Sequence, residues 1–279
     1  MYQFDAEIRD IGIIIMKSHV LPNGLAVKHT NTLETIHLYQ DIFVLKCYLQ
    51  HGITLPENSV VIDGGANIGM FSLFVLQNCP TASIHAFEPA PKTFEVLKAN
   101  LSSRGKAVVN NAGLGSHSTQ ELFTYMPGAT TASGYYDEQM VVQMKERMRE
   151  TILADPQGAR SYKGPLGEEL LNLHLNESLK GQVVTSQVRS ISDYIDEKGI
   201  SIINLLKLDV ECRERAVLSG IRDEHWPMIQ QVVIEVHTRL DDPMPEVLSI
   251  FDTRGFSVAY EPEEGMLTTM VYARRIQQS

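Results

Sequence analysis

The chain has 279 residues, of which 43% are hydrophobic and 21% are charged. This balance is typical of a soluble globular protein, and the length is sufficient for one large α/β domain with an insertion. The formal net charge of −10 disfavours a nucleic-acid partner, because binding to a phosphate backbone requires clustered Lys and Arg side chains.

The cysteines and the N-terminus indicate a cytoplasmic protein. Cys47, Cys79 and Cys212 are far apart and lack the spacing of a zinc site, so we expect reduced, buried thiols. The N-terminal segment 1–10 is acidic, where a secretory signal would be basic. The apolar run 11–16 is too short to span a bilayer, which takes about 20 residues, so we expect no membrane association.

Residues 1–57 are expected to form an N-terminal extension that caps a core domain of residues 58–279. A Pro-Asn-Gly triplet predicts a turn in this extension. After the turn, apolar residues recur at helical spacing, beginning with Leu33 and Ile36 and ending at Phe43. This spacing predicts an amphipathic helix that packs ahead of the core.

The segment from Ser59 to Asn111 alternates predicted strands with predicted helices. Short apolar runs predict the strands, and apolar residues on one face predict the helices. The expected strands are 59–63, 83–87 and a third from 107 to 109, and the expected helices are 68–77 and 91–102. Strands and helices in this order predict a parallel sheet with right-handed crossovers.

The alternation is interrupted by an insertion at about 128–182. A loop rich in Gly and Thr comes first, followed by a helical stretch with Met140, Met144, Met148 and Ile152 four residues apart. A second helical stretch covers 166–179. We expect these helices to form an inserted lid over a ligand-binding site, with the methionines serving as packing residues.

The C-terminal part returns to the α/β pattern. Apolar strands are predicted at 202–208 and 231–236, a helix at 245–254, and a terminal antiparallel hairpin formed by 256–260 and 267–273. A seven-stranded, mostly parallel sheet with a C-terminal hairpin is the Rossmann-like fold of class I methyltransferases. We therefore expect an α/β protein of this fold.

A glycine-rich turn follows the first strand of the core domain and opens directly into a helix. Glycines let the backbone approach a ligand, and a helix N-terminus offers free N–H groups. Nicotinamide and flavin domains use G-x-G-x-x-G here to hold a pyrophosphate, but an acid before the glycines would repel that group and instead suits the cationic methionyl part of S-adenosylmethionine. The residues expected to bind this cofactor are Asp63, Gly64, Gly65, Ala66, Asn67 and Gly69.

Glu88, followed by Pro89, ends the second strand about 25 residues after the turn. A carboxylate at this place can accept hydrogen bonds from both ribose hydroxyls of a bound nucleoside. The alternative is that Asp63 and Glu88 only cap the helices that follow them. The order of strand, glycine turn, helix, strand and acid favours a nucleoside site.

With these motifs the chain resembles the FkbM family of methyltransferases. Blocks at 61–72 and 86–100 carry the likeness, together with Leu-Lys-Leu-Asp-Val-Glu at 206–211 and Val-Leu-Ser-Gly-Ile at 217–221. The N-terminal part resembles the branch found with polyketide and nonribosomal peptide pathways. The resemblance implies S-adenosylmethionine as cofactor and, usually, O-methylation of a natural-product or sugar hydroxyl. In one departure, Cys212 replaces the glycine that usually follows Val-Glu in the family.

Candidate catalytic residues follow the strands, because ligands of this fold bind beyond the carboxyl ends of the strands. His237 is expected to be the general base, since the ordinary pKa of histidine is about 6.5; a structural role after a buried strand is the alternative. Asp209 and Glu211 could orient the acceptor, bind the methionyl amine or hold a divalent metal. Asn111 is a further candidate for cofactor binding, and Lys207 is expected to pair with a carboxylate. No metal site is assigned.

The expected function is O-methylation of a hydroxyl on a small-molecule or carrier-tethered natural-product intermediate. The alternatives are an N-methyltransferase and a methyltransferase-like protein that binds the nucleoside without catalysis. A nicotinamide-dependent oxidoreductase is disfavoured by Asp63 and by the different glycine spacing. The sequence does not identify the acceptor or the oligomeric state.

Overall fold

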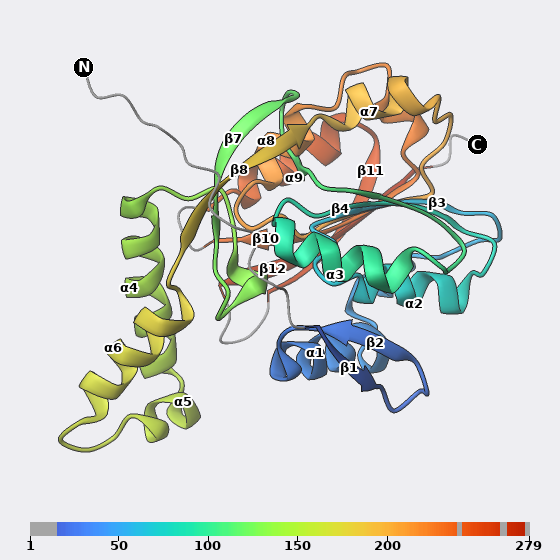
Figure 1. The fold of residues 1–279 in the computed structure, drawn as a ribbon. Coiled ribbons are helices and arrows are strands. Elements are labelled where there is room, and N and C mark those ends of the chain that lie inside the picture. Colours follow the sequence, from blue (N-terminus) through green and yellow to red (C-terminus); the bar gives the residue numbers. More distant parts are fainter. Residues whose placement is uncertain (1–15, 239–241, 263–266, 277–279) are drawn as a thin grey trace, which may run out of the picture.

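A seven-stranded sheet forms the centre of the computed structural model, which describes residues 16–238, 242–262 and 267–276 (Figure 1). Within these residues the strand order is β11-β12-β10-β9-β3-β4-β5, and β12 alone runs antiparallel to its neighbours. The strands are β3 (Val60–Gly64), β4 (Ser83–Phe87), β5 (Lys106–Asn110), β9 (Leu205–Leu208), β10 (Gln231–His237), β11 (Phe256–Pro262) and β12 (Thr268–Arg275). This order confirms the predicted class I fold and its terminal hairpin.

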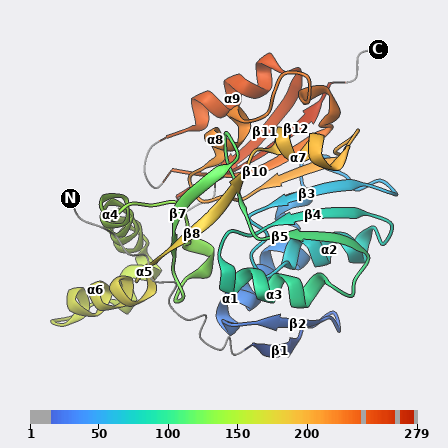
Figure 2. The same ribbon diagram turned by 45° about the horizontal axis from the view of Figure 1, so that its top comes forward.

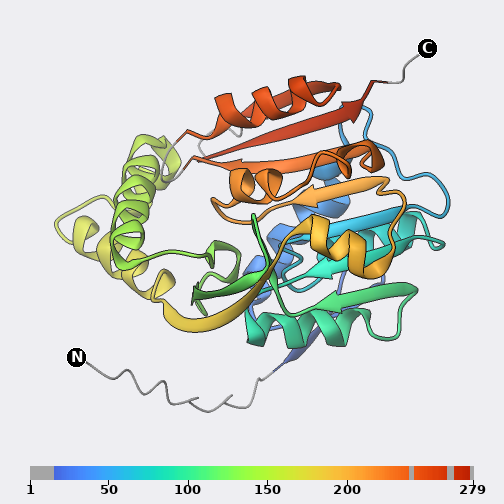
Figure 3. The same ribbon diagram turned by 90° about the horizontal axis from the view of Figure 1, so that it is seen from above.

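Helices cover both faces of this sheet, so the central strands β3, β9 and β10 are buried on both sides (Figures 1 and 3). One face packs against α2 (Met70–Asn78) and α3 (Pro91–Leu101), and the other against α7 (Ile191–Lys198), α8 (Glu214–Ser219) and α9 (Met244–Thr253). Two-sided burial explains why the strands read as continuous apolar runs. In the described part of the chain, no helix is both long and apolar enough to cross a membrane.

The N-terminal part packs beneath α2 and α3. It contains β1 (Lys17–Val20), β2 (Ala26–His29), α1 (Thr32–Tyr39), a π-helical turn (Gln40–Val44) and a short 3₁₀ helix (Cys47–Leu49). The predicted turn joins β1 to β2, and the predicted helix is present. Its expected apolar face was wrong, however, because Leu33 and Ile36 are 70% and 48% exposed, whereas Tyr39 and Phe43 pack against the core. Most of the predicted apolar run 11–16 lies outside the described residues.

A second sheet, not predicted from the sequence, joins the insertion to the core. It consists of β6 (Gly113–Leu114), β8 (Gln182–Arg189) and β7 (Thr119–Tyr125), in that order. Between β7 and β8 the chain forms α4 (Glu138–Ala154), α5 (Pro156–Ser161) and α6 (Gly167–Ser178). Figures 1 and 2 show these helices at the end of the β7–β8 ribbon, projecting away from the main sheet. The predicted inserted helices are therefore present, carried on a β-ribbon.

Candidate active site

The glycine turn lies at the carboxyl edge of the sheet, directly after β3. Gly65 has φ +70°, and a Cβ atom there would lie 1.7 Å from the carbonyl oxygen of Asp209. No side chain fits in this space, so glycine is required where β3 and β9 approach each other. Asn67 also has positive φ (48°), and its Oδ1 accepts a hydrogen bond of 2.7 Å from the backbone N–H of Ile68.

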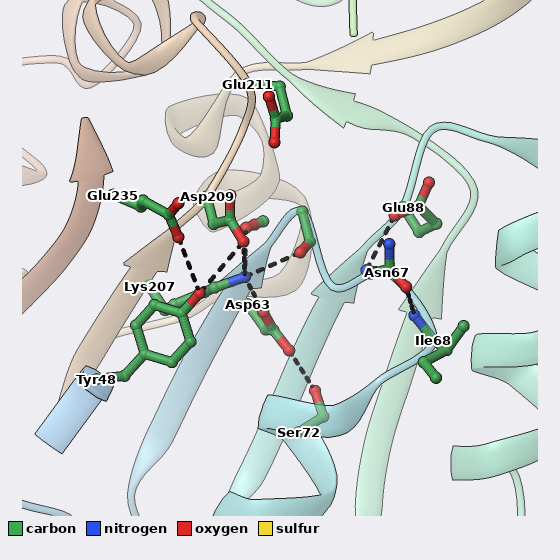
Figure 4. Close-up of polar contacts among 12 residues, drawn as sticks. Tyr48, Asp63, Asn67, Ile68, Ser72, Glu88, Lys207, Asp209, Glu211 and Glu235 are labelled. Carbon is green, nitrogen blue, oxygen red and sulfur yellow. Dashed lines mark hydrogen bonds and ion pairs between the residues drawn. The ribbon is translucent and has the colours of Figure 1, made fainter. Parts of the chain in front are cut away.

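Glu88 follows β4 and is buried, with only 6% of its surface exposed. Its Oε1 accepts a hydrogen bond of 2.8 Å from the Ala90 N–H, and its Oε2 accepts one of 3.0 Å from the Asn67 N–H (Figure 4). Burial raises the pKa of Glu88 to about 7, although both backbone donors oppose the shift. Glu88 thus links the end of β4 to the glycine turn.

A cavity opens beside this turn, and we call it the first cavity. Of the residues predicted to bind the cofactor, five line it: Gly65, Asn67, Glu88, Pro89 and Asp209. Phe123, Thr130, Ser133 and Tyr135, from β7 and the loop after it, form the opposite wall. Asn111 has a supporting place, since its Nδ2 donates to the carbonyl oxygen of Glu88 at 2.9 Å and so fixes the end of β4.

Asp63 does not line the first cavity, so its predicted contact with the cofactor stays a prediction. Its side chain is completely buried, accepts a 2.6 Å hydrogen bond from Ser72 Oγ and lies 3.3 Å from Lys207 Nζ (Figure 4). Lys207 Nζ in turn donates to the carbonyl oxygen of Gly65 at 2.9 Å. Asp63 therefore positions the glycine turn through Lys207, because the ion pair fills the space between β3 and β9.

Lys207 pairs with carboxylates, as predicted. Besides Asp63, its Nζ lies 3.6 Å from Oδ2 of Asp209. Burial lowers the pKa of this ammonium group, but Asp63 and Asp209 outweigh that effect and raise the pKa on balance. Lys207 is therefore charged at neutral pH and serves as a fixed cation beneath the site.

A second cavity adjoins the first, on the side of the N-terminal part. It is lined by Tyr48 of the 3₁₀ helix and by Glu235 of β10. The Tyr48 hydroxyl donates to Asp209 Oδ2 at 3.2 Å and approaches Glu235 Oε2 at 3.4 Å (Figure 4). Burial, together with these two carboxylates, raises the pKa of Tyr48 well above its usual value, so the phenol keeps its proton. The sequence had no motif that pointed to Tyr48.

The two cavities share part of their walls. Leu38, Thr131, Asp209 and Glu211 line both. Two of the three predicted catalytic residues, Asp209 and Glu211, therefore lie where the cavities meet, and we call this place the junction.

His237 lies behind the junction and lines neither cavity, so its role as general base stays a prediction. Its side chain is fully buried, Nδ1 is 2.7 Å from Glu214 Oε1, and Nε2 is 3.3 Å from Glu211 Oε1. Burial lowers the pKa of His237, but Glu211 and Glu214 outweigh burial and hold the pKa well above its usual value. Both ring nitrogens of His237 thus face carboxylates.

Glu211 is directed toward the junction by an unusual backbone turn. Glu211 and Cys212 both have positive φ, 52° and 68°. The second of these is where the FkbM family usually has glycine, and the left-handed conformation explains that preference. Tyr136 donates its hydroxyl proton to Glu211, whose Oε2 and carbonyl oxygen each lie 3.3 Å away. Such strained positions are common at functional sites.

The loop before α4 closes the first cavity against the N-terminal part. The backbone N–H and the hydroxyl of Thr130 donate to the two Glu34 carboxylate oxygens, at 2.6 and 2.9 Å. Asn67 Nδ2 lies 3.2 Å from Thr130 Oγ1. Among the described residues that line the two cavities, those of the insertion belong to the segment 130–135 rather than to α4–α6. The lid role of those helices thus stays a prediction.

The strand order, the glycine turn after β3 and the acid after β4 define a class I methyltransferase dependent on S-adenosylmethionine. Residues 63–258 match the family model described as a methyltransferase FkbM domain. The chain belongs to this family, as its motifs had indicated.

The relatives support this assignment. The chain is 38% identical to the 31-O-demethyl-FK506 methyltransferase FkbM of Streptomyces tacrolimicus, over 87% of this chain and 90% of that protein. It is also 35% identical to the AMB antimetabolite synthetase AmbE of Pseudomonas aeruginosa, over 79% of this chain but only 10% of that protein. Among solved structures, M. jannaschii TYW2 in complex with AdoMet is similar with a TM-score of 0.42 and 12% identity, over 95% of this chain and 89% of the other.

Proposed function

We propose that this methyltransferase transfers the methyl group of S-adenosylmethionine to a hydroxyl group of a small natural-product intermediate, either free or tethered to a carrier protein. The observation that carries the proposal is the junction. The first cavity has the glycine turn and Glu88, which suit the nucleoside, and the second cavity is separate from these groups. The methyl group would move from the first cavity to the second beside Asp209 and Glu211, which line both cavities.

The cofactor fits the residues of the first cavity. Glu88 presents a carboxylate whose oxygens each retain a lone pair for a ribose hydroxyl, beyond the bonds from Ala90 and Asn67. Asp209 and Glu211 offer negative charge to the methionyl ammonium group or to the sulfonium. Asp63, through Lys207, keeps the turn in place.

The reaction requires a proton acceptor at the junction. The acceptor O–H loses its proton to a carboxylate while the oxygen lone pair attacks the methyl carbon. The C–S bond breaks and its electron pair stays on sulfur, leaving a neutral thioether. Because His237 lines neither cavity, the proton would go to a carboxylate of the second cavity, for which Glu235 is suited by its 21% side-chain exposure. General-base catalysis typically contributes about 10²- to 10⁴-fold.

The carboxylates favour a hydroxyl over an amine as acceptor. A neutral amine attacks without prior loss of a proton, whereas an alcohol has to lose its proton as the methyl group arrives. The Streptomyces relative is named as a 31-O-demethyl-FK506 methyltransferase, and this name supports the same choice. A non-catalytic role is disfavoured because acidic groups lie at the junction rather than apolar ones.

The test is a panel of acceptors in matched pairs. Each alcohol is compared with the corresponding amine, free and attached to a phosphopantetheine-loaded carrier protein, and S-adenosylhomocysteine formation is measured with mass detection of the product. We expect methylation of alcohols by the wild-type chain and a loss of about 10²-fold or more in Glu235→Gln. Methylation of the amines alone would contradict the hydroxyl acceptor.

A further inference from the structure

We propose that Asp209, Glu211 and His237 bind one hard divalent cation, Mg²⁺ or Mn²⁺, at the junction of the two cavities. The binding of this cation is independent of the proposed function. Its catalytic role rests on the proposed function. Asp209 follows β9, Glu211 lies on the left-handed turn after it, and His237 ends β10. Adjacent parallel strands thus bring the three side chains to one point.

The spacing of the three side chains suits a single ion. One ligand atom from each lies within 4.8 Å of the others. Two ligands on opposite sides of a Mg²⁺ ion, at about 2.0–2.1 Å each, are separated by about 4.0–4.2 Å. The set can therefore surround one ion with only small side-chain adjustments.

The imidazole of His237 supplies an observation independent of the acidic cluster. Its Nε2 atom is buried and makes no hydrogen bond of acceptable geometry with the described residues. The atom faces the carboxylates, with Oε1 of Glu211 at 3.3 Å and Oδ1 of Asp209 at 4.0 Å. A cation bound between these groups would give Nε2 the partner that it lacks.

The second ring nitrogen of His237 has the partner that metal-binding histidines usually have. Nδ1 lies 2.7 Å from Oε1 of Glu214, which is itself 1% exposed. Metal-bound histidines typically donate this other N–H to a carboxylate, which fixes the ring and directs the lone pair of the remaining nitrogen to the ion. Glu214 is accordingly the positioning residue of the site.

The donor set and the open side of the site indicate which ion binds and what it does. Two carboxylates and one imidazole, with further positions left for water or substrate oxygen, suit Mg²⁺ or Mn²⁺. Asp209 and Glu211 line the second cavity, so an acceptor hydroxyl there can reach the ion. Coordination lowers the pKa of a bound hydroxyl and holds its oxygen in line with the methyl group, while Glu235 remains outside the ligand set to receive the proton.

The experiment measures binding of Mn²⁺ alone to chelator-treated, dialysed protein, by calorimetry and by the loss of the free-ion EPR signal. We expect one equivalent bound by the wild type and affinity at least about tenfold weaker in Glu211→Gln and in Glu214→Gln. Glu261→Gln is the matched control, because Glu261 lines the second cavity but lies outside the cluster. Its affinity for Mn²⁺ should equal that of the wild type.

Circular dichroism shows that each variant is folded, and titration of the wild type with S-adenosylhomocysteine separates this proposal from the function. If the wild type binds the nucleoside but no Mn²⁺, or if Glu211→Gln binds Mn²⁺ as tightly as the wild type, the metal site is overturned and hydroxyl methylation stands. If Mn²⁺ binds as expected while only amines are methylated, the metal site stands and the proposed acceptor does not.

Discussion

Lys207 Nζ lies 3.3 Å from Asp63 Oδ1, and at most 3% of either side chain is exposed. This buried ion pair joins β3 to β9 and also holds the glycine turn, because Lys207 donates to the carbonyl oxygen of Gly65. Asp63, the acid before the glycines, thus shapes the cofactor site from behind.

Removing one member of this pair should be strongly destabilising. Asp63→Asn leaves the buried Lys207 ammonium with Asp209 as its remaining ion-pair partner, at 3.6 Å, so we expect a loss of about 3 kcal/mol in the free energy of unfolding. Urea denaturation measures the loss. The control is Glu246→Gln, which breaks an exposed pair with Arg215 and should cost less than about 1 kcal/mol. Equal effects of the two substitutions would contradict the role of the buried pair.

Gly65→Ala should abolish nucleoside binding. The new methyl group would collide with the Asp209 carbonyl, and φ +70° is unfavourable for alanine. The matched control is Gly199→Ala, which has φ +61° but open space around the added atom. We expect the control to lose about 1–2 kcal/mol of stability and to keep its affinity for S-adenosylhomocysteine. Retained affinity in Gly65→Ala would show that β3 and β9 are less closely packed.

Nucleoside affinity should depend on pH through Glu88. With a pKa of about 7 in the free protein, Glu88 gains a proton as the pH falls from 8 to 6. The ribose hydroxyls donate to the ionised carboxylate, so binding weakens as the pH falls, by at most about tenfold per pH unit below the pKa. Calorimetry in buffers of different ionisation enthalpy should detect proton release at pH 6 and little at pH 8. Glu88→Gln should remove this dependence, and a pH-dependent affinity that persisted in the variant would rule out Glu88 as its source.

The N-terminal part should close the first cavity through Glu34. Glu34→Ala removes both bonds to Thr130, and a hydrogen bond to a charged group contributes about 1.5–3 kcal/mol. We expect faster amide hydrogen exchange in residues 128–136 and weaker nucleoside binding. Leu33→Ala, on the exposed face of the same helix, is the control and should change neither quantity. Unchanged exchange in Glu34→Ala would show that the closure does not depend on this contact.

The main sheet was predictable because its central strands β3, β9 and β10 are buried on both faces and therefore read as apolar runs. The second sheet was missed because β7 and β8 are partly exposed along their length and mix Thr, Gln and Glu with apolar residues. The alternation of polar and apolar residues in β7 and β8 predicts strands only weakly, whereas the helical pattern of the segment between them is long and clear.

Several of the residues predicted for the site line it, notably Glu88, Asp209 and Glu211, because strand ends in a parallel sheet converge at one edge. The raised pKa of His237 could not be predicted from the sequence. It depends on Glu214, which lies 23 residues away and is brought beneath the ring by α8. Tyr48 and Glu34 come from outside the α/β pattern, so no strand-end rule selects them.

The central claim is that the first cavity holds the methyl donor and the second holds the acceptor. It is tested most directly by measuring S-adenosylhomocysteine affinity in Glu88→Ala and Glu235→Gln beside the wild type. Loss of two charge-assisted hydrogen bonds, each contributing about 1.5–3 kcal/mol, predicts a loss of at least about tenfold in Glu88→Ala. Glu235→Gln should bind the nucleoside as the wild type does. Unchanged affinity in Glu88→Ala together with lost affinity in Glu235→Gln would place the methyl donor in the second cavity and would contradict this claim.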